Sequence, residues 1–487
     1  MTDQAASTRA APANPLTKAE ITGIILGLLL AMLLAALDQT IVATAMPTIG
    51  HDLGDMQNLP WVVTAYLLTS TAVTPLYGKL SDIHGRRIVL LVAIVVFSLG
   101  SVACAMAPTM LALTLARGLQ GLGGGGLLVM AQTIIGDMVS PRERAQYQGY
   151  IASVFVTSSL AGPVLGGFFA EHLSWSLIFW INLPLGLAAY LMTNDKLRRL
   201  PRHERPHALD LLGALLLVLA TAALLLALSW GGVHFSWGSR EILGLLGVSA
   251  VLWGAFVVRL WSAHEPLIPL SVLKNPVVAM GTLAACFGMG IFIGLSIYMP
   301  IYLEGVLGLS ASQSGLALIP LMSGTVAGAT LSGRLMTKMV HYKRVPLIGL
   351  ACAVLFTAGL AFASRGMPLW MLEVLLTGIS MGLGTLLPVT TVAIQNAVAM
   401  HDLGTATASM NFFRSLGGAI IVAVFGTIVL GTGGGLHAGD LRTLTATESA
   451  GLAETFRLVF AAAAAGLAAA LAFIACMEER PLRGRAP

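Results

Sequence analysis

Long apolar segments follow one another from residue 21 to residue 477, and no polar stretch between them is long enough to form a separate folded domain. A helix needs about 20 mainly apolar residues to cross a bilayer. Only 10% of the residues are charged, whereas soluble domains carry about 25%. The pattern predicts an all-α membrane protein that crosses the bilayer many times, and it excludes the soluble and disordered classes.

Fourteen segments have the length and composition expected of a membrane span. They are residues 21–46, 59–77, 88–107, 109–136, 145–169, 177–193, 209–230, 241–261, 277–303, 312–335, 345–364, 368–393, 404–430 and 456–477. An even number of spans places both termini on the same side of the membrane.

The Lys and Arg residues indicate which side that is. With the N-terminus inside, 21 of the 27 fall in inner segments, and two, Arg117 and Arg414, lie within spans. The four in outer segments are Arg240, Arg365, Arg442 and Arg457. Because basic residues favour cytoplasmic loops, we expect both termini in the cytoplasm. This asymmetry also explains the net charge of +5 without a nucleic-acid partner.

An internal repeat is suggested by matches at an offset of 255 residues. Gly78, Leu80, Gly149 and Gly162 correspond to Gly333, Leu335, Gly404 and Gly417. Parallel repeats of this kind build many secondary transporters, with the substrate cavity between the halves. The expected parts are a tail (1–20), a six-helix bundle (21–193), a basic linker with an inserted helix pair (194–276), a second six-helix bundle (277–477) and a tail (478–487).

The loop between the second and third spans contains Gly78, Asp82, Gly85, Arg86 and Arg87. The glycines allow a tight turn, and the acid among bases can pair with a neighbouring helix end and be released when the halves move. The alternative is a loop that is basic only because it is cytoplasmic. The full spacing favours a role in gating.

A second candidate for conformational gating is the run formed by Gly162, Pro163, Gly166 and Gly167. Proline interrupts helix hydrogen bonding, and glycines permit close helix contact. We expect a bend that helps to close one side of the cavity; packing alone is the alternative.

Asp38 is the strongest candidate for a functional residue because it lies inside an apolar span, where a charge costs about 3 kcal/mol or more. Arg117 is its expected partner. Both lie eight residues from the outer end of their spans, which places them at the same depth, about 12 Å below the surface. We predict that the pair couples transport to protons; a static ion pair is the alternative.

Three further charged residues are candidates for substrate binding or secondary coupling. Glu304 and Glu373 could attract cationic compounds or take part in proton release, or they could be solvated acids near an interface. Arg414 lies deep in its span, where it could bind an anionic substrate group or serve a structural role.

Several motifs resemble those of the major facilitator superfamily, in particular its fourteen-helix drug:proton antiporters. They are the loop at 78–87, the first-helix segment 37–47, the fourth-helix segment 117–121 (RGLQG), the fifth-helix segment 162–167 (GPVLGG) and the segment 180–186 (WINLPLG). Ser158 and Ser176 depart from the family pattern, and Thr337, the counterpart of Asp82, lacks the acid.

The resemblance implies two six-helix bundles plus an inserted pair, in a bacterial plasma (inner) membrane. It also implies proton-coupled antiport of amphiphilic or cationic drugs and toxic compounds out of the cell, powered by the proton gradient without a cofactor. The alternatives are a dedicated exporter of one metabolite, siderophore or lipid, and, more remotely, an intramembrane enzyme or channel. An accessory export subunit is not indicated.

Short motif matches do not support an enzyme or a metal site. No phosphate-binding GxxxxGK[ST] loop occurs, and the glycine run at 121–126 has no preceding strand. The four cysteines have no metal-ligand spacing. We therefore expect no bound metal and no nucleotide chemistry.

Overall fold

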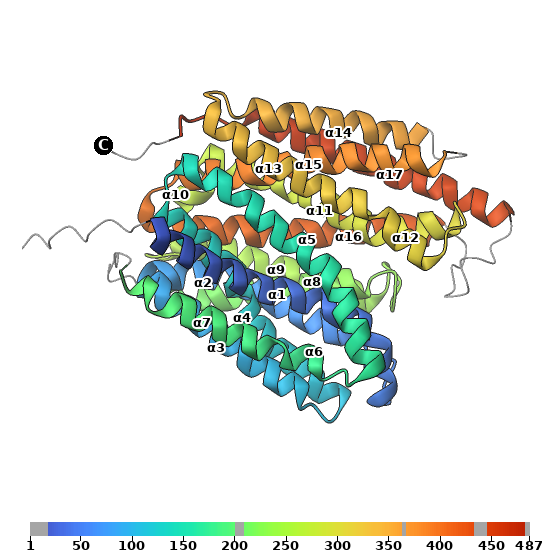
Figure 1. Ribbon diagram of the computed structural model, residues 1–487, viewed down its shortest axis with the longest axis horizontal. Coiled ribbons are helices and arrows are strands. Elements are labelled where there is room, and N and C mark those ends of the chain that lie inside the picture. The colour runs from blue at the N-terminus through green and yellow to red at the C-terminus, as the bar shows by residue number, and fades with distance from the viewer. Residues whose placement is uncertain (1–17, 200–208, 363–366, 433–445, 483–487) are drawn as a thin grey trace, which may run out of the picture.

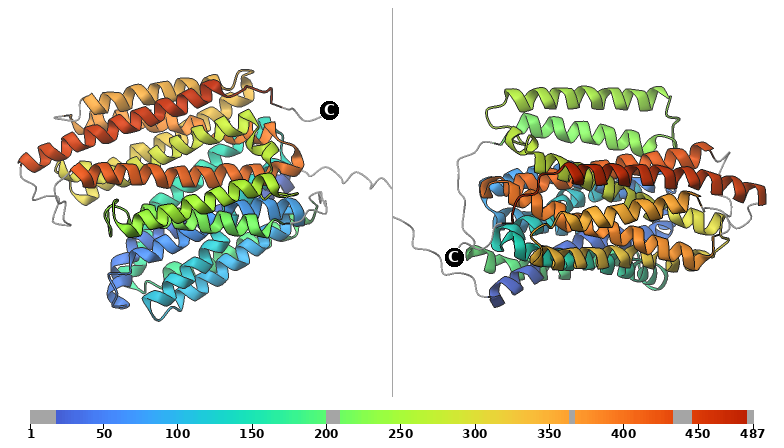
Figure 2. Two further views of the ribbon diagram at one scale, coloured as in Figure 1. Left: turned by 180° about the vertical axis from the view of Figure 1, so that it is seen from behind. Right: turned by 90° about the horizontal axis from the view of Figure 1, so that it is seen from above.

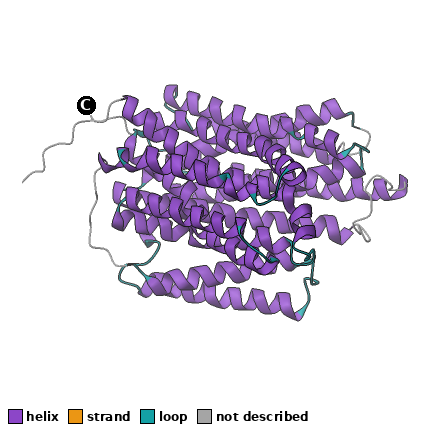
Figure 3. Ribbon diagram, turned by 60° about the horizontal axis from the view of Figure 1, so that its bottom comes forward, coloured by secondary structure: helices purple, strands orange, loops and turns teal. Residues whose placement is uncertain are grey.

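The computed structural model describes residues 18–199, 209–362, 367–432 and 446–482. These residues form helices and short connections, with no strand among them (Figure 3). Thirteen of the described helices are long and apolar enough to cross a membrane. The remaining expected span, 59–77, forms a helix of 25 residues that is rich in threonine and serine. The prediction of an all-α membrane fold is confirmed.

The N-terminal part of the chain forms seven helices. They are α1 (Lys18–Asp52), α2 (Pro60–His84), α3 (Arg86–Ala105), α4 (Met110–Met138), α5 (Pro141–His172), α6 (Leu177–Trp180) and α7 (Asn182–Asn194). The expected sixth span, 177–193, is divided at Ile181 into α6 and α7. This interruption positions Asn182 at the first turn of α7.

The middle of the chain forms the helical pair expected at 209–230 and 241–261. Its elements are η1 (Lys196–Arg199), α8 (Leu211–Trp230), α9 (Arg240–Ser262) and α10 (Leu270–Leu273). Leu217 and Phe256 of the pair pack with Phe412 and Leu416, which belong to a helix of the C-terminal part. Leu76 of α2 packs against the same cluster, so the pair contacts both parts of the chain.

The C-terminal part contains the remaining helices. They are α11 (Pro276–Gly305), α12 (Ala311–Ala317), α13 (Ile319–Lys338), α14 (Arg344–Phe362), α15 (Leu369–Ala397), η2 (Met400–Asp402), α16 (Leu403–Thr432) and α17 (Ala446–Cys476). The expected span 312–335 is divided between α12 and α13.

Two groups of helices lie side by side in Figure 1, with α1 to α7 below and α11 to α17 above. Figure 2 shows α8 and α9 against one side of both. Each group has its own buried apolar core. Of the expected tail 1–20, only residues 18–20 are described. Arg365 and Arg442 also lie outside the described ranges.

The helix ends nearest the C-terminus lie on the left of Figure 1, and several basic residues belong to these ends. We call this end the basic face; it is defined by Lys79, Arg86, Arg87, Lys338 and Arg344. At the basic face, α2 contacts α16 and α5 contacts α13.

Glycines bring the two helix groups into backbone contact at the basic face. A Cβ on Gly78 would lie 2.6 Å from the carbonyl oxygen of Gly404, and a Cβ on Gly333 would meet the carbonyl of Ala145. The helix pairs α2–α16 and α13–α5 are counterparts under the 255-residue repeat. The two contacts are therefore equivalent, and any side chain at Gly78 or Gly333 would separate the groups.

Candidate functional site

Asp38 and Arg117 form an ion pair in the interior of the N-terminal helix group. Arg117 Nη1 donates to Asp38 Oδ2 at 2.5 Å. The two side chains are 0% and 1% exposed, so water does not reach either charge. The expectation that the two residues lie at the same depth agrees with this contact. A buried pair of this kind needs additional hydrogen bonds to offset its desolvation.

Two amide side chains supply those hydrogen bonds to Asp38. Gln120 Nε2 donates to Asp38 Oδ1 at 2.7 Å, and Asn182 Nδ2 donates to the same oxygen at 3.0 Å. Both amides also donate to Ser101 Oγ, at 2.7 and 3.0 Å. The network joins α1, α3, α4 and α7 around one carboxylate.

Arg117 has partners besides Asp38. Its Nη1 donates to Gln120 Oε1 at 2.6 Å and its Nε donates to the carbonyl of Val62 at 3.0 Å. The guanidinium lies 4.3 Å from the ring centre of Tyr66 and 5.8 Å from that of Phe179. These contacts stabilise the cation independently of the carboxylate. Arg117 thus keeps partners when Asp38 is neutral.

Gln120, Asn182 and Ser101 were not singled out from the sequence. Gln120 and Asn182 lie inside the motif segments 117–121 and 180–186, and all three are polar residues within apolar spans. That signal was available, because a polar side chain in a span needs a partner. Which partner each one meets depends on how four helices pack.

The loop between α2 and α3 contains a sharp turn at Gly85, whose φ of 87° favours glycine. The turn follows Asp82, whose carboxylate faces α16. Asp82 Oδ2 accepts from the backbone N–H of Thr405 at 2.8 Å and from its hydroxyl at 2.6 Å. Asp82 Oδ1 accepts from the N–H of Gly404 at 3.2 Å. Asp82 therefore caps the N-terminus of α16 across the boundary between the helix groups.

Arg86 and Arg87 bind within their own helix group. Arg86 contacts the Asp82 carboxylate and donates from Nε to Asp137 Oδ2 of α4 at 2.7 Å. Arg87 donates to the carbonyl and the side-chain oxygen of Asn194 at 2.8 and 2.6 Å. The two arginines fix the loop to the N-terminal helix group, whereas Asp82 contacts α16 of the C-terminal group.

The corresponding helix end in the N-terminal group has a cap of its own. At the start of α5, the Ser140 side chain accepts from the N–H of Glu143, and Glu143 Oε2 accepts from the N–H of Ser140 at 3.1 Å. Thr337, the counterpart of Asp82, bonds to the carbonyl of Arg334 in its own helix. The cross-boundary cap exists on one side only.

The glycines of the 162–167 run have different surroundings. Cβ atoms on Gly162 and Gly166 would collide with α1, the first with the Thr40 side chain and the second with the Thr44 hydroxyl and the carbonyl of Ile41. Gly167 has no neighbour within 4 Å of such an atom, so it does not serve close packing. Pro163 lies inside the continuous helix α5. Two of the three glycines in this run thus allow α5 to pack closely against α1.

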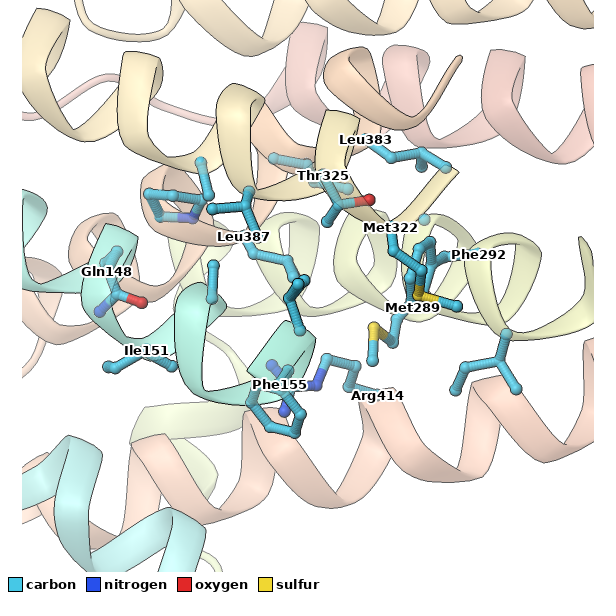
Figure 4. Close-up of a pocket in the computed structure, with 18 of the residues that line it drawn as sticks. Gln148, Ile151, Phe155, Met289, Phe292, Met322, Thr325, Leu383, Leu387 and Arg414 are labelled. Carbon is cyan, nitrogen blue, oxygen red and sulfur yellow. The ribbon is translucent and has the colours of Figure 1, made fainter. Parts of the chain in front are cut away.

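A cavity of about 220 Å³ lies among α4, α5, α11, α13, α15 and α16 (Figure 4). Its lining is mainly apolar and includes Phe155, Met289, Phe292 and Met322. Arg414 of α16 also lines it and extends toward Phe155 in Figure 4. An apolar cavity with few polar groups is the usual form of a small-molecule site.

A polar chain connects this cavity wall to the N-terminal group. Arg414 Nη2 donates to Asn411 Oδ1 at 2.5 Å, and Asn411 Nδ2 donates to Gln132 Oε1 at 2.8 Å. Gln132 belongs to α4, the helix that carries Arg117. The structure therefore links the cavity and the ion pair through one helix.

The structure does not bring all the candidate residues together. Asp38 and Arg117 do not line the cavity, and neither do Glu304 and Glu373. Glu304 lies near the end of α11 and Glu373 near the start of α15, both partly exposed. Arg414 is the one candidate from this group that faces the cavity. In the described residues no cluster of His, Cys, Asp and Glu could hold a metal ion.

The sequence matches the family model of the Major Facilitator Superfamily over residues 28–422. It is 35% identical to the multidrug transporter protein MdtP of Bacillus subtilis, over 85% of this chain and 76% of that protein. It is 36% identical to multidrug resistance protein 3 of the same organism, covering 85% of this chain and 79% of that one. The efflux pump aunC of Aspergillus niger is 35% identical, over 80% and 75%.

Solved structures with the same fold are more distant in sequence. A bacterial homologue of the iron transporter ferroportin, in an outward-facing state, superimposes with a TM-score of 0.65 at 13% identity, covering 94% of this chain and 98% of that one. The proton:xylose symporter XylE gives a TM-score of 0.61 at 14% identity, covering 92% and 95%. At these identities the likeness concerns the fold.

Proposed function

Because the chain belongs to the Major Facilitator Superfamily, we propose that it is a secondary efflux transporter that exchanges amphiphilic organic compounds for protons by alternating access. The similar proteins named multidrug transporter and efflux pump support export as the direction. The apolar cavity supports an amphiphilic substrate, since flexible side chains such as Met289 and Met322 fit many shapes.

The single observation that carries proton coupling is the enclosed ion pair of Asp38 and Arg117. In such an enclosed site a charged carboxylate is strongly attracted by the paired cation, so gain or loss of one proton by Asp38 changes the interaction between the helices that carry the pair. Asp38 Oδ2 is the atom that would take the proton. Protonation would remove the attraction to Arg117 Nη1, which would keep its bonds to Gln120 and Val62. The pair can thus exist in two charge states without stranding the cation.

The two states would differ in how strongly α1 and α4 attract each other. Helix α4 also carries Gln132, which accepts from Asn411 of α16. Since 15 residues separate Arg117 from Gln132, about 22 Å of rigid helix connects the ion pair with the cavity wall. A shift of α4 on protonation would therefore reach α16, whose N-terminus Asp82 holds at the basic face.

We place the basic face in the cytoplasm of a bacterial cell, following the distribution of Lys and Arg. In this structure the basic face is closed by the glycine contacts and the Asp82 cap. Closing there blocks return of a substrate to the cytoplasm. The proton gradient would supply the energy, about 2.3 kcal/mol per charge per 100 mV. Lipid, protons and the small-molecule substrate are the proposed partners.

Dye efflux from proteoliposomes with an imposed pH gradient tests the proposal. Asp38→Asn should abolish gradient-dependent efflux, because an amide cannot gain or lose the proton. Asp195→Asn is the matched control: it makes the same chemical change on a side chain that is 79% exposed. Full gradient-dependent efflux by Asp38→Asn would refute coupling at this pair.

A panel of unrelated amphiphiles in the same assay addresses the alternative of one dedicated metabolite, siderophore or lipid. Efflux of several unrelated compounds supports a broad substrate range. Glu304 and Glu373, the two residues proposed to attract cationic compounds, lie outside the cavity lining.

A further inference from the structure

We propose that the cavity selects amphiphilic organic anions, and that Arg414 binds their carboxylate, sulfonate or phosphate group. This inference rests on the proposed efflux function and specifies the substrate class. Of the amphiphilic or cationic compounds expected from the resemblance it retains the amphiphilic character, and of the two roles considered for Arg414 it selects the binding of an anionic group. Its basis is the charge composition of the cavity wall.

Arg414 is the one ionisable side chain among the residues that line the cavity within the described structure. The other polar lining residues are neutral: Gln132, Gln148, Ser159, Ser296, Thr325 and Thr391. A substrate in the cavity therefore meets a single positive charge and no negative one. Two unit charges of the same sign at short range in a poorly hydrated site repel strongly. An organic cation would be disfavoured there.

Arg414 also lacks a carboxylate partner in the part of the chain that the structure describes. Its one side-chain hydrogen bond there is to the neutral amide of Asn411 at 2.5 Å. A guanidinium carries five N–H donors in a planar fork that matches the two oxygens of a carboxylate. The half-buried side chain faces the cavity, so its remaining donors are available to a ligand.

The partners of Arg117 differ from those of Arg414. Arg117 has a carboxylate at 2.5 Å, a carbonyl oxygen and an aromatic face. Among the described residues Arg414 has no such set, although it also lies within a membrane-spanning helix. A cation without a counter-ion in a membrane-spanning helix is costly, and an anionic ligand would lower that cost. The difference between the two arginines points to a partner that arrives with the substrate.

The rest of the cavity supplies the surface for an apolar body. Phe155 of α5, Met289 and Phe292 of α11, and Leu387 of α15 are placed around Arg414 (Figure 4). A molecule with an anionic end and an aromatic or aliphatic body satisfies both features. The same anionic chemistry occurs in free organic acids and in anionic lipids, and the experiment has to separate these sources.

Binding of an anion to Arg414 would also alter a hydrogen bond that crosses the boundary between the helix groups. Asn411, the present partner of Arg414, donates to Gln132 of α4 at 2.8 Å. An anion that draws the guanidinium away from Asn411 frees the Asn411 side-chain oxygen and changes this link. Substrate occupancy and the position of α4 would then be coupled.

The test uses three fluorescent probes with one apolar body: dansylglycine, its methyl ester, and a dansyl amide with a trimethylammonium group. Equilibrium binding to the purified full-length chain, without any gradient, reports the charge preference of the cavity. We expect dansylglycine to bind about tenfold or more tightly than the cation, because a charge-assisted hydrogen bond contributes at least that ratio. Equal or tighter binding of the cation would overturn the proposal.

Arg414→Gln should weaken dansylglycine binding about tenfold or more and leave the methyl ester nearly unchanged. Arg414→Lys keeps the charge without the fork and should lose less. Arg457→Gln is the matched control, since that arginine is 52% exposed and pairs with Glu454. Monodisperse elution in size exclusion establishes that each variant is folded. If Arg414→Gln does not fold, the comparison of Arg414→Lys with wild type decides. Unchanged dansylglycine affinity in a folded variant would refute the proposal.

Competition separates the two sources of the anion. Displacement of bound dansylglycine by phosphatidylglycerol but not by phosphatidylcholine indicates a lipid headgroup, and displacement by a short organic acid alone indicates a soluble one. Failure of the proposed function is distinguishable. Gradient-driven efflux of cations with no anion binding would refute this inference and leave the proposed antiport standing. Anion binding without gradient-driven exchange would support this inference and refute the proposed antiport.

Discussion

Asp82 of α2 and Thr405 of α16, 323 positions apart in the chain, are joined by two hydrogen bonds to a single carboxylate oxygen. The backbone N–H and the hydroxyl of Thr405 both donate to Asp82 Oδ2, at 2.8 and 2.6 Å. Together with the N–H of Gly404, which donates to Asp82 Oδ1, this contact provides polar interactions across the boundary at the basic face. Its loss should therefore change how often that face opens.

Asp82→Asn should open the basic face more often, because the amide loses the charge that favours the α16 N-terminus. A charge-assisted bond contributes about 1.5–3 kcal/mol, which corresponds to about tenfold or more in population. The measurement is labelling of Leu403→Cys, a fully buried position at the start of α16, by a hydrophilic thiol reagent in a background without the native cysteines. An equal labelling rate in the Asp82→Asn and Asp195→Asn chains would contradict this prediction.

A double substitution distinguishes a coupling pair from a static one. Asp38→Asn alone removes the counter-ion of Arg117, which keeps its bonds to Gln120 and Val62, so stability should fall by less than the about 3–5 kcal/mol expected of a buried charge left with no partner. Asp38→Asn with Arg117→Gln removes both charges and should recover most of the thermal stability, while gradient-dependent efflux remains absent. Recovery of efflux together with stability would show that the pair serves packing only.

Gly166 and Gly167 offer a comparison between neighbouring residues. Gly166→Ala should lower thermal stability, because its methyl group would meet the carbonyl of Ile41 in α1. Gly167→Ala should be neutral or stabilising by up to about 1 kcal/mol, since no atom lies within 4 Å and alanine favours helix. Unfolding followed by tryptophan fluorescence measures both. Equal destabilisation by the two substitutions would contradict the packing assignment.

The inserted pair should depend on Phe256 for its attachment. That ring is 2% exposed and packs in the cluster that contains Leu76 and Phe412. Phe256→Ala should cost about 3–5 kcal/mol, whereas Val257→Ala, on a side chain 42% exposed, should cost little. Protease cleavage in the connection between α9 and α10 is the measurement. Equal cleavage rates for the two variants would show that the pair is held by other contacts.

The sequence was sufficient to predict the spans and the contact between Asp38 and Arg117. Apolar length locates a span, and equal distance from the outer ends of two spans placed Asp38 and Arg117 at one depth. The boundaries were less accurate where a span is interrupted, as at Ile181, because hydropathy does not register a break in a helix.

The neighbours of these residues could not be derived in the same way. Gln120 and Asn182 reach Asp38 from α4 and α7, and no local pattern states that those helices meet α1 there. Arg414 was recognised as deep, but its position in the cavity wall depends on the rotation of α16. The depth of a residue in the membrane can be predicted from its place in a span, whereas the neighbours that its side chain meets depend on how the helices pack.

The unequal capping of two equivalent helices has a consequence for hydration. Helix α5 keeps its cap when the groups separate, because Ser140 and Glu143 belong to its own first turn. Helix α16 loses Asp82 and must expose the N–H groups of Gly404 and Thr405 to water. Parting of the basic face is then tied to the entry of water at a single helix end, and a drier environment there would hold the transporter shut.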